Sequence, residues 1–408
     1  MRVLLSDGSG LTARQSANRL AAAGHVVAVL APDPLCLCRF TRHVTRVHRV
    51  PPYGPDPLGW LEAALAIYRS GDFDVLFPTQ EQVAVLSLAQ DRLRSEGVAT
   101  VVPRFDSLAA VQDKISACAT LRRLGLPQPP SATEAEGWTR YPAFVKEPIG
   151  TASGGVRRVA DADALRSATA GRPVLIQAAV EGPLAMCQAV FDRGSLVAFH
   201  TNQRTGEGAN GGASHKRSTE VPDARHWFEV LGAGLEWHGA LSADVILEAG
   251  GPVFIDVNPR LVEPENAWHS GVDLVGPMME LALGSRPGLQ PRSRSGVATH
   301  QLLLAILGSA QQGRGRRGVA GELLHAWRKS GAYRESVEEL TPLAHDPEAM
   351  LPVVMAAAAT MATPRSWSWF ANGSVTNYAL SEAGWQRILV SARRTPPSPP
   401  RGHGSSTG

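Results

Sequence analysis

The stretch ALSADVILEAGGPVFIDVNPR, residues 240–260, contains two apolar strands that each carry an aspartate. Successive side chains of a strand point to opposite faces, so Asp244, Asp256 and Asn258 share one polar face. If the chain reverses in an odd-numbered loop centred on Gly250, Asp244 lies directly opposite Asp256. The other face of this predicted hairpin is apolar and consists of Ala243, Val245, Leu247, Val253, Ile255 and Val257.

Two carboxylates that face each other across a hairpin repel, so a cation is needed to offset them. Carboxylate and amide oxygens are the hard ligands that Mg²⁺ prefers. The hairpin therefore predicts a magnesium site at Asp244, Asp256 and Asn258 or, if the register differs by one residue, two aspartates that face solvent. Arg260 favours the metal site, because a cation beside a metal–carboxylate cluster is explained by a phosphate bound to both.

A second candidate phosphate site follows the strand AFVK, which ends at Lys146. The next residues, 150–155, are rich in glycine and could present backbone N–H groups to phosphate oxygens beside the lysine ammonium. The loop lacks the G-x-x-x-x-G-K-[ST] pattern, and a flexible hairpin turn is the alternative. Lys114 opens a predicted helix in QDKISA, where a solvated lysine is the alternative.

Taken in chain order, Lys114, Lys146 with its glycine-rich loop, the segment VLIQAAVEG and the segment FIDVNPR resemble the ATP-grasp superfamily. That superfamily contains biotin carboxylase, carbamoyl phosphate synthetase and D-alanine–D-alanine ligase. The resemblance covers residues 1–285 and implies an α/β and α+β fold. The expected order is a Rossmann-like pre-ATP-grasp domain with a parallel sheet, 1–105; an ATP-grasp small subdomain, 106–180; a catalytic subdomain, 181–290; a mainly helical region, 291–393; and a disordered tail, 394–408.

The resemblance also implies roles for single residues. Asp244, Asp256 and Asn258 correspond to the Mg²⁺ ligands, with Mn²⁺ as an alternative ion, and Arg260 corresponds to the arginine that stabilises the acyl-phosphate. Lys146 is the second expected catalytic residue. Glu181 is expected to replace the acidic ribose ligand, which is absent at Leu184. The residues expected to hold ATP are Lys114, Lys146, Gly150, Ser153, Gly154, Gly155, Gln177, Ala178, Ala179, Val180 and Glu181.

The candidate substrate residues are scattered. Glu81 follows the strand FDVLFPT, at the end of a parallel strand where α/β sheets bind ligands, with capping of the next helix as the alternative. Arg204, Ser214 and Lys216 fall in a polar, glycine-rich segment, 203–217, expected to be a lid or mobile loop. Arg204 could hold a carboxylate and Glu263 an amine, although loop acids are often simply solvated.

Spacing of apolar residues predicts further elements. Strands are expected at the start of the chain, at HVVAVLAP and over 98–103, VATVVP, with one helix over 81–97. The basic cluster around Arg39 and Arg49 is expected to be a solvated face or an anion site. The four cysteines form neither a disulfide framework nor a zinc pattern and are expected to be reduced.

Bulk composition limits the class of protein. The chain has 408 residues, a formal charge of +3 and 44% hydrophobic residues, with no apolar run long enough to span a membrane and no N-terminal signal sequence. We therefore expect a cytoplasmic protein with no nucleic-acid or membrane partner, and a homodimer as the candidate assembly.

The function implied by the resemblance is an ATP-dependent ligase of the carbon–nitrogen class, with small-molecule carboxylate and amine substrates. It would activate the carboxylate as an acyl-phosphate, convert ATP to ADP and phosphate, and transfer the acyl group to the amine. Two alternatives remain: a carboxylase or carbamoyl-phosphate-type enzyme that activates bicarbonate, and an ATP-binding module without turnover.

Overall fold

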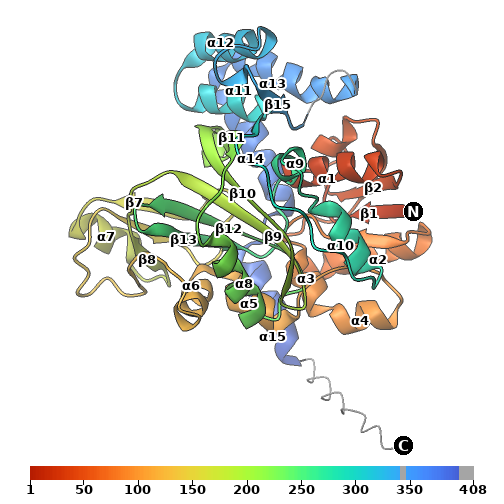
Figure 1. Ribbon diagram of the computed structural model, residues 1–408, viewed down its shortest axis with the longest axis horizontal. Coiled ribbons are helices and arrows are strands. Elements are labelled where there is room, and N and C mark those ends of the chain that lie inside the picture. The colour runs from red at the N-terminus through yellow and green to blue at the C-terminus, as the bar shows by residue number, and fades with distance from the viewer. Residues whose placement is uncertain (341–345, 395–408) are drawn as a thin grey trace, which may run out of the picture.

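The computed structural model describes residues 1–340 and 346–394 and is built around three sheets (Figure 1). The first is a four-stranded parallel sheet in the order β3-β2-β1-β4, with β1 Arg2–Leu5, β2 Val26–Ala31, β3 Val44–Arg49 and β4 Val75–Phe77. The predicted parallel N-terminal sheet is confirmed. β3 was not predicted, because it lies in the basic cluster and its largely polar side chains resemble a surface segment.

Helices α1 Leu11–Ala22, α2 Pro57–Ser70, α3 Val83–Leu88 and α4 Gln90–Ser95, with the short helix η1 Leu37–Arg39, complete this part. The single helix predicted over 81–97 is divided at Ala89, which ends α3 and precedes α4. The strand predicted over 98–103 is wrong: in the described chain this segment is irregular and meets β4 through one backbone bond, from Leu76 N–H to Ala99 O. The four cysteines are free, as predicted, and all four are buried.

A small antiparallel sheet follows, in the order β5-β8-β6-β7. Helices α5 Phe105–Gln112 and α6 Lys114–Arg123 lead into it, and Asp113 caps α6 by accepting a hydrogen bond from Ser116 N–H at 2.8 Å. Its elements are β5 Ser131–Ala132, β6 Ala143–Lys146, β7 Val156–Val159, α7 Ala162–Thr169 and β8 Leu175–Ala178.

The largest sheet has seven strands in the order β13-β12-β9-β10-β11-β14-β15. Helix α8 packs on this sheet through Phe228, which contacts Phe199 and Phe254 at ring-centroid distances of 5.4 and 5.9 Å. The elements are β9 Leu184–Asp192, β10 Ser195–Glu207, η2 Ala209–Gly211, β11 Ala213–Ser218, α8 Ala224–Gly234, β12 Gly239–Glu248, β13 Gly251–Asn258, α9 Glu265–His269, α10 Val275–Ala282, β14 Ala298–His300 and β15 Ser336–Glu338.

The β12–β13 hairpin has the predicted opposition of Asp244 and Asp256 but reaches it by another route. Glu248 pairs with Gly251, so the loop has two residues and is not centred on Gly250. A β-bulge then leaves Ile255 unpaired between the pairs Val245–Phe254 and Asp244–Asp256. The predicted strict alternation on β13 is therefore wrong. Phe254, not Ile255 or Val253, turns into the core with Val257.

The segment 203–217 is not the loop that its composition predicted. β10 continues to Glu207, β11 begins at Ala213, and only η2 and its flanking glycines form the turn between them. Glycine and polar residues fit this hairpin because the strand pairing supplies the backbone hydrogen bonds.

The C-terminal region is mainly helical, as predicted. Its longer helices are α11 Leu302–Gln311, α12 Gly315–Trp327, α13 Met350–Ala362, α14 Trp367–Tyr378 and α15 Glu382–Arg394, with the short helices η3 Gly331–Tyr333, η4 Pro347–Ala349 and η5 Pro364–Ser366. The predicted disordered tail, 394–408, lies outside the described residues except for Arg394, which ends α15.

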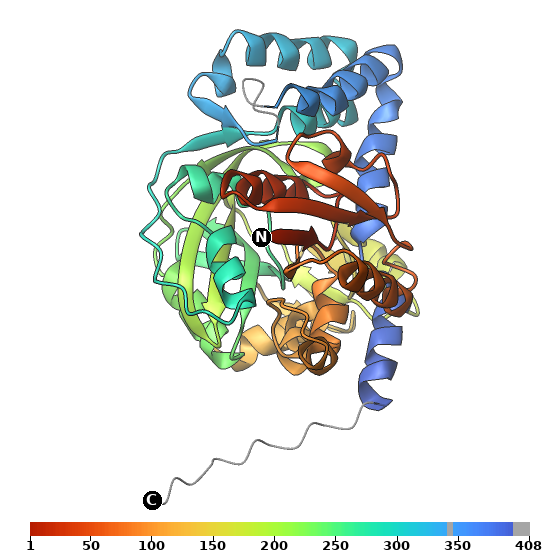
Figure 2. The ribbon, with the colours of Figure 1, turned by 90° about the vertical axis from the view of Figure 1, so that its right-hand side faces the viewer.

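Helices α14 and α15 return the end of the chain to the N-terminal part (Figure 2). α14 runs from the helical region to the loop after β1, and α15 then packs against α2 and α3. Ser381 Oγ donates to Gly54 O at 2.6 Å, and the buried ring of Trp385 lies 6.0 Å from that of Phe105. We call this segment, 374–388, the C-terminal clasp.

The contact between α15 and the N-terminal part leaves no room for a side chain at Gly384. A β-carbon there would lie 2.1 Å from Gly54 O, a backbone atom that cannot turn away. We predict that Gly384→Ala lowers the free energy of unfolding by about 1–3 kcal/mol, measured by urea denaturation. Gly373→Ala in α14, where a β-carbon meets nothing within 4 Å, should be neutral or slightly stabilising. Equal losses in both variants would contradict the close contact.

Candidate active site

The polar face of the β12–β13 hairpin brings two carboxylates and an amide together. Asp244 and Asp256 are direct cross-strand partners, and Asn258 Nδ2 donates to Asp244 Oδ2 at 3.4 Å. Burial raises the pKa of Asp244 to about 6, and the charge of Asp256 adds to this effect. The arrangement costs free energy without a cation and supplies carboxylate and amide oxygens of the kind that suit Mg²⁺.

Lys146 reaches this hairpin from the small sheet. Its Nζ donates to Ile255 O and to Gln177 Oε1, both at 2.7 Å, and the side chain is only 6% exposed. Burial lowers the pKa of Lys146, and the charges of Asp256 and Asp244 oppose that change. The bulge at Ile255 thus turns a backbone carbonyl toward the ammonium, which lies close to both carboxylates.

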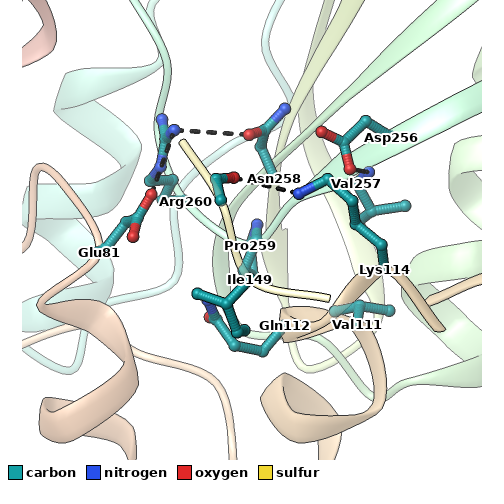
Figure 3. A pocket seen from close by; sticks show the side chains of 11 residues that line it. Glu81, Val111, Gln112, Lys114, Ile149, Asp256, Val257, Asn258, Pro259 and Arg260 are labelled. Carbon is teal, nitrogen blue, oxygen red and sulfur yellow. Dashed lines mark hydrogen bonds and ion pairs between the residues drawn. The ribbon is translucent and has the colours of Figure 1, made fainter. Parts of the chain in front are cut away.

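The glycine-rich loop lies over the same region. Lys114 Nζ donates to Gly150 O at 3.1 Å, and the hydroxyl of Thr151 donates to Glu81 Oε1. At Gly150 a β-carbon would lie 2.2 Å from Gly154 O, so only glycine allows this tight turn. Lys114, Gly150, Glu81, Asp256, Asn258 and Arg260 line one cavity, drawn in Figure 3.

Arg260 and Glu81 face each other at the edge of this cavity (Figure 3). A guanidinium nitrogen of Arg260 lies 3.4 Å from Asn258 Oδ1 and 3.9 Å from Glu81 Oε1. The second oxygen of Glu81 accepts a hydrogen bond from Leu380 N–H at 2.6 Å, at the start of the turn after α14. Glu81 therefore joins the N-terminal part, the glycine-rich loop and the C-terminal clasp.

The predicted adenine hinge, Gln177 to Val180, ends strand β8. Ala178 N–H donates to Pro130 O at 2.9 Å and Ala179 N–H to Pro142 O at 3.0 Å. Ala178, Ala179 and Val180 line a second cavity with Tyr141 and Glu248 among others, and Glu181 follows as an exposed residue. The next residue, Val180, contributes its amide to neither of these two contacts.

Lys216 is held by acids rather than open to a carboxylate substrate. Its Nζ pairs with Glu263 and, at 2.7 Å, with Glu339. Burial alone lowers the pKa of Lys216, but the two carboxylates outweigh burial and raise it. Gln301 Nε2 also donates to Glu263, whose own N–H donates to Thr12 Oγ1 at 3.1 Å. The structure therefore places Glu263 in a network of buried polar groups.

Arg204 and Ser214 lie on the β10–β11 hairpin and do not line the cavity around Arg260. Arg204 donates to Gly211 O at 2.7 Å and pairs with Glu207 at 3.3 Å. Ser214 is buried, 3.2 Å from the ring nitrogen Nδ1 of His215. The structure brings neither residue together with the predicted catalytic pair.

Sequence reasoning missed the contributions of the C-terminal region. Glu339 pairs with Lys216, and the Leu380 amide binds Glu81. No local pattern could have identified Leu380, because it acts through its backbone. The buried glutamate Glu339 follows the short polar strand β15 and carries no motif.

A family model for the ATP-grasp domain matches residues 111–264. The matched segment contains both lysines, the glycine-rich loop, the hinge and the hairpin with Arg260. This chain contains an ATP-grasp domain. No curated protein sequence is similar enough to be matched to it.

Solved structures share the fold of this chain over a longer stretch. The biotin carboxylase domain of the Hydrogenobacter thermophilus 2-oxoglutarate carboxylase, solved with MgADP and bicarbonate, is 17% identical, with a TM-score of 0.57 and 73% of each chain covered. N5-carboxyaminoimidazole ribonucleotide synthetase from Thermus thermophilus is also 17% identical, with a TM-score of 0.56, covering 74% of this chain and 82% of that one. Campylobacter jejuni biotin carboxylase is 15% identical, with a TM-score of 0.56, covering 73% and 74%.

The TM-scores and coverages of these structures show a shared fold that extends beyond the matched domain. Within residues 1–340 and 346–394, no group of three or more His, Cys, Asp or Glu side chains is arranged to hold a metal ion, so the site on the hairpin depends on two carboxylates and an amide. In the same part of the chain, no helix combines the length and hydrophobicity needed to cross a bilayer.

The opposed carboxylates should make the metal-free protein less stable than its neutralised variant. The pKa of Asp244 is about 6 in the folded state and 3.8 in the reference state, so folding takes up a proton between these pH values and this group disfavours folding above pH 6. We predict that Asp244→Asn raises the free energy of unfolding at pH 8 without Mg²⁺ by about 1–2 kcal/mol.

Urea denaturation from pH 4 to pH 8 in the presence of a chelator measures this difference, which should shrink as the pH falls below 6. Asp163→Asn, at an exposed helix position, is the control and should show no such pH-dependent gain. A less stable Asp244→Asn protein at pH 8 would show that another group already neutralises the carboxylate.

Proposed function

We propose that the protein is an ATP-dependent ligase that activates a small-molecule carboxylate as an acyl-phosphate and transfers the acyl group to an amine. The observation that carries the proposal is the convergence of Lys146, Asp244, Asp256 and Arg260 on one polar face within a matched ATP-grasp domain. Such a face can hold the anionic oxygens of a phosphoryl group between cations and metal ligands.

The residues present fit Mg²⁺ together with a nucleotide. Asp244, Asp256 and Asn258 would hold the ion, with Mn²⁺ as an alternative, because their carboxylate and amide oxygens lie together on one face of the hairpin. Bound there, the ion would supply positive charge to phosphate oxygens. Lys146 and Lys114 would contact those oxygens, and residues 150–155 would cover them.

The adenine end of ATP would lie against the hinge. Because the amides of Ala178 and Ala179 donate to Pro130 and Pro142, the base edge is left with the Val180 amide and with hinge carbonyls. Glu181 is the proposed ribose contact. Ser153, Gly154 and Gly155 would present backbone groups to the phosphates.

In the first step, a carboxylate oxygen attacks the γ-phosphorus, the bond to the β-phosphate oxygen breaks, and ADP leaves. Lys146 would hold the transferred phosphoryl group in line. In the second step, the amine nitrogen attacks the carbonyl carbon, the bond from that carbon to the phosphate oxygen breaks, and phosphate departs with the proton of the amine. Arg260 would stabilise the oxyanion that forms between these two events.

Activation of bicarbonate is the second candidate, because two of the similar structures are biotin carboxylases and one was solved with bicarbonate. Release of ADP on adding bicarbonate, without any organic carboxylate or amine, would favour it.

An ATP-binding module without turnover would bind ATP and release no ADP with any substrate. The cytoplasmic location and the homodimer also remain proposals.

The test is an ADP-release assay with MgATP and pairs drawn from the amino acids, other carboxylates and ammonium chloride. We predict that Lys146→Met and Asp256→Asn each lower turnover at least about 100-fold, with circular dichroism spectra like that of the wild type. Lys329→Met is the matched control, because Lys329 is exposed and outside the cavity. Near-normal turnover of either site variant would overturn the assignment of the site.

A further inference from the structure

Glu81 lies between strand β4 and helix α3, and both oxygens of its carboxylate are bound within the chain. The hydroxyl of Thr151, in the glycine-rich loop, donates to Oε1. The backbone N–H of Leu380, in the C-terminal clasp, donates to Oε2 at 2.6 Å. One side chain thus joins segments that are 70 residues and 299 residues away from it along the chain.

The backbone of Glu81 is fixed as well. The hydroxyl of Tyr53, a buried residue, donates to Glu81 O at 2.8 Å. The Glu81 side chain is itself only 11% exposed. Hydrogen bonds to a carboxylate are stronger than those between neutral groups, and they gain further strength where water is largely excluded. The direction of this carboxylate is therefore set by the fold.

Arg260 approaches the oxygen of Glu81 that Thr151 binds. A guanidinium nitrogen of Arg260 lies 3.9 Å from Oε1 and 3.4 Å from Asn258 Oδ1, and the arginine side chain is 12% exposed (Figure 3). At 3.9 Å the pair is held by charge rather than by a hydrogen bond. The Glu81 carboxylate therefore holds the guanidinium beside Asn258, one of the proposed metal ligands.

The glycine-rich loop has a backbone that needs support from outside it. Ala152 and Ser153 have φ angles of 51° and 62°, in the left-handed region that residues other than glycine rarely adopt. Each such residue costs about 1 kcal/mol or more, so contacts with the rest of the fold must offset the cost. The bond from Thr151, the residue immediately before this pair, to Glu81 is one of these contacts.

We propose, on the basis of the ligase function above, that Glu81 is a positioning residue that couples closure of the glycine-rich loop to the C-terminal clasp and to Arg260. When the loop closes over a nucleotide, the Thr151 hydroxyl completes the Glu81 carboxylate, which then holds Leu380 and Arg260 where they lie here. When the loop opens, the carboxylate loses that donor. Coupling between two segments is reciprocal, so whatever holds the loop closed also stabilises the clasp at Leu380.

The same coupling would keep water out of the reaction. An acyl-phosphate that meets water in place of the amine is hydrolysed: the water oxygen attacks the carbonyl carbon, the bond from that carbon to the phosphate oxygen breaks, and the free carboxylate and phosphate are released together with a proton. ATP is then converted to ADP and phosphate with no amide formed. A loop held closed through Glu81 excludes this water until the amine has reacted.

Hydrogen–deuterium exchange of the full chain tests the coupling, with the magnesium complex of adenylyl imidodiphosphate as a non-hydrolysable nucleotide. In the wild type, the nucleotide should slow exchange in the peptide over 147–158. It should also slow exchange at least about fivefold in the peptide over 378–386, which contains the Leu380 amide. Thr151→Val removes the hydroxyl and keeps the shape of the side chain. In this variant the nucleotide should still protect the loop and no longer protect Leu380.

Thr376→Val is the matched control, because the exposed Thr376 hydroxyl donates to Gly373 O within its own helix. Its Leu380 amide should respond to the nucleotide as in the wild type. Glu81→Ala should leave that amide in fast exchange with and without the nucleotide. Protection of Leu380 that persists in Thr151→Val, or that is missing from the wild type while the loop is protected, would overturn the coupling.

Product analysis gives a second readout, for every carboxylate and amine pair that releases ADP. We expect Thr151→Val and Glu81→Ala to form less amide per ADP than the wild type, and Thr376→Val to form as much. An unchanged ratio in both site variants would overturn the role of Glu81 in excluding water. A nucleotide that protects neither the loop nor the hinge of the wild type would instead overturn the proposed function.

Discussion

The hydrogen bond from Lys146 to the Ile255 carbonyl is the contact on which the site depends. It joins the small sheet to the large one, and it exists because the bulge turns one carbonyl out of the β12–β13 ladder. The same bulge absorbs the residue that a two-residue loop would otherwise put out of register, so Asp244 still faces Asp256. One irregular residue therefore aligns the carboxylates with each other and with the lysine.

A second set of contacts joins the C-terminal segment of the chain to the site. One carboxylate oxygen of Glu81 accepts a hydrogen bond from the Thr151 hydroxyl, and the other accepts one from the Leu380 amide. Arg260 lies near the oxygen that binds Thr151. The N-terminal sheet is thus more than a support for the ATP-grasp domain. Strand β4 ends at Phe77, shortly before Glu81, the residue that the glycine-rich loop and the clasp share.

The features that could be predicted from sequence are those set by local chemistry. Alternating strand and helix patterns predicted the parallel sheet, and the spacing of Asp244 and Asp256 predicted their opposition. The bulge could not be predicted, because Ile255 looks like any inward-facing residue and only the packing of Phe254 reveals it. Composition predicts a loop over 203–217, because glycine and polar residues outweigh the strand pattern of this part of the β10–β11 hairpin. The roles of Glu339 and the Leu380 amide arise from contacts between distant segments, which no local pattern records.

The C-terminal clasp has a consequence for how such a chain can change over time. The residues that line the cavity between Glu81 and Arg260 all precede position 261, whereas Leu380 belongs to a C-terminal segment that contacts one of them, Glu81. Substitutions in the last two helices can therefore change what lies beside Glu81 while the residues that line the cavity stay the same. The fold thus separates the residues that line the cavity from the C-terminal segment that holds one of them in place.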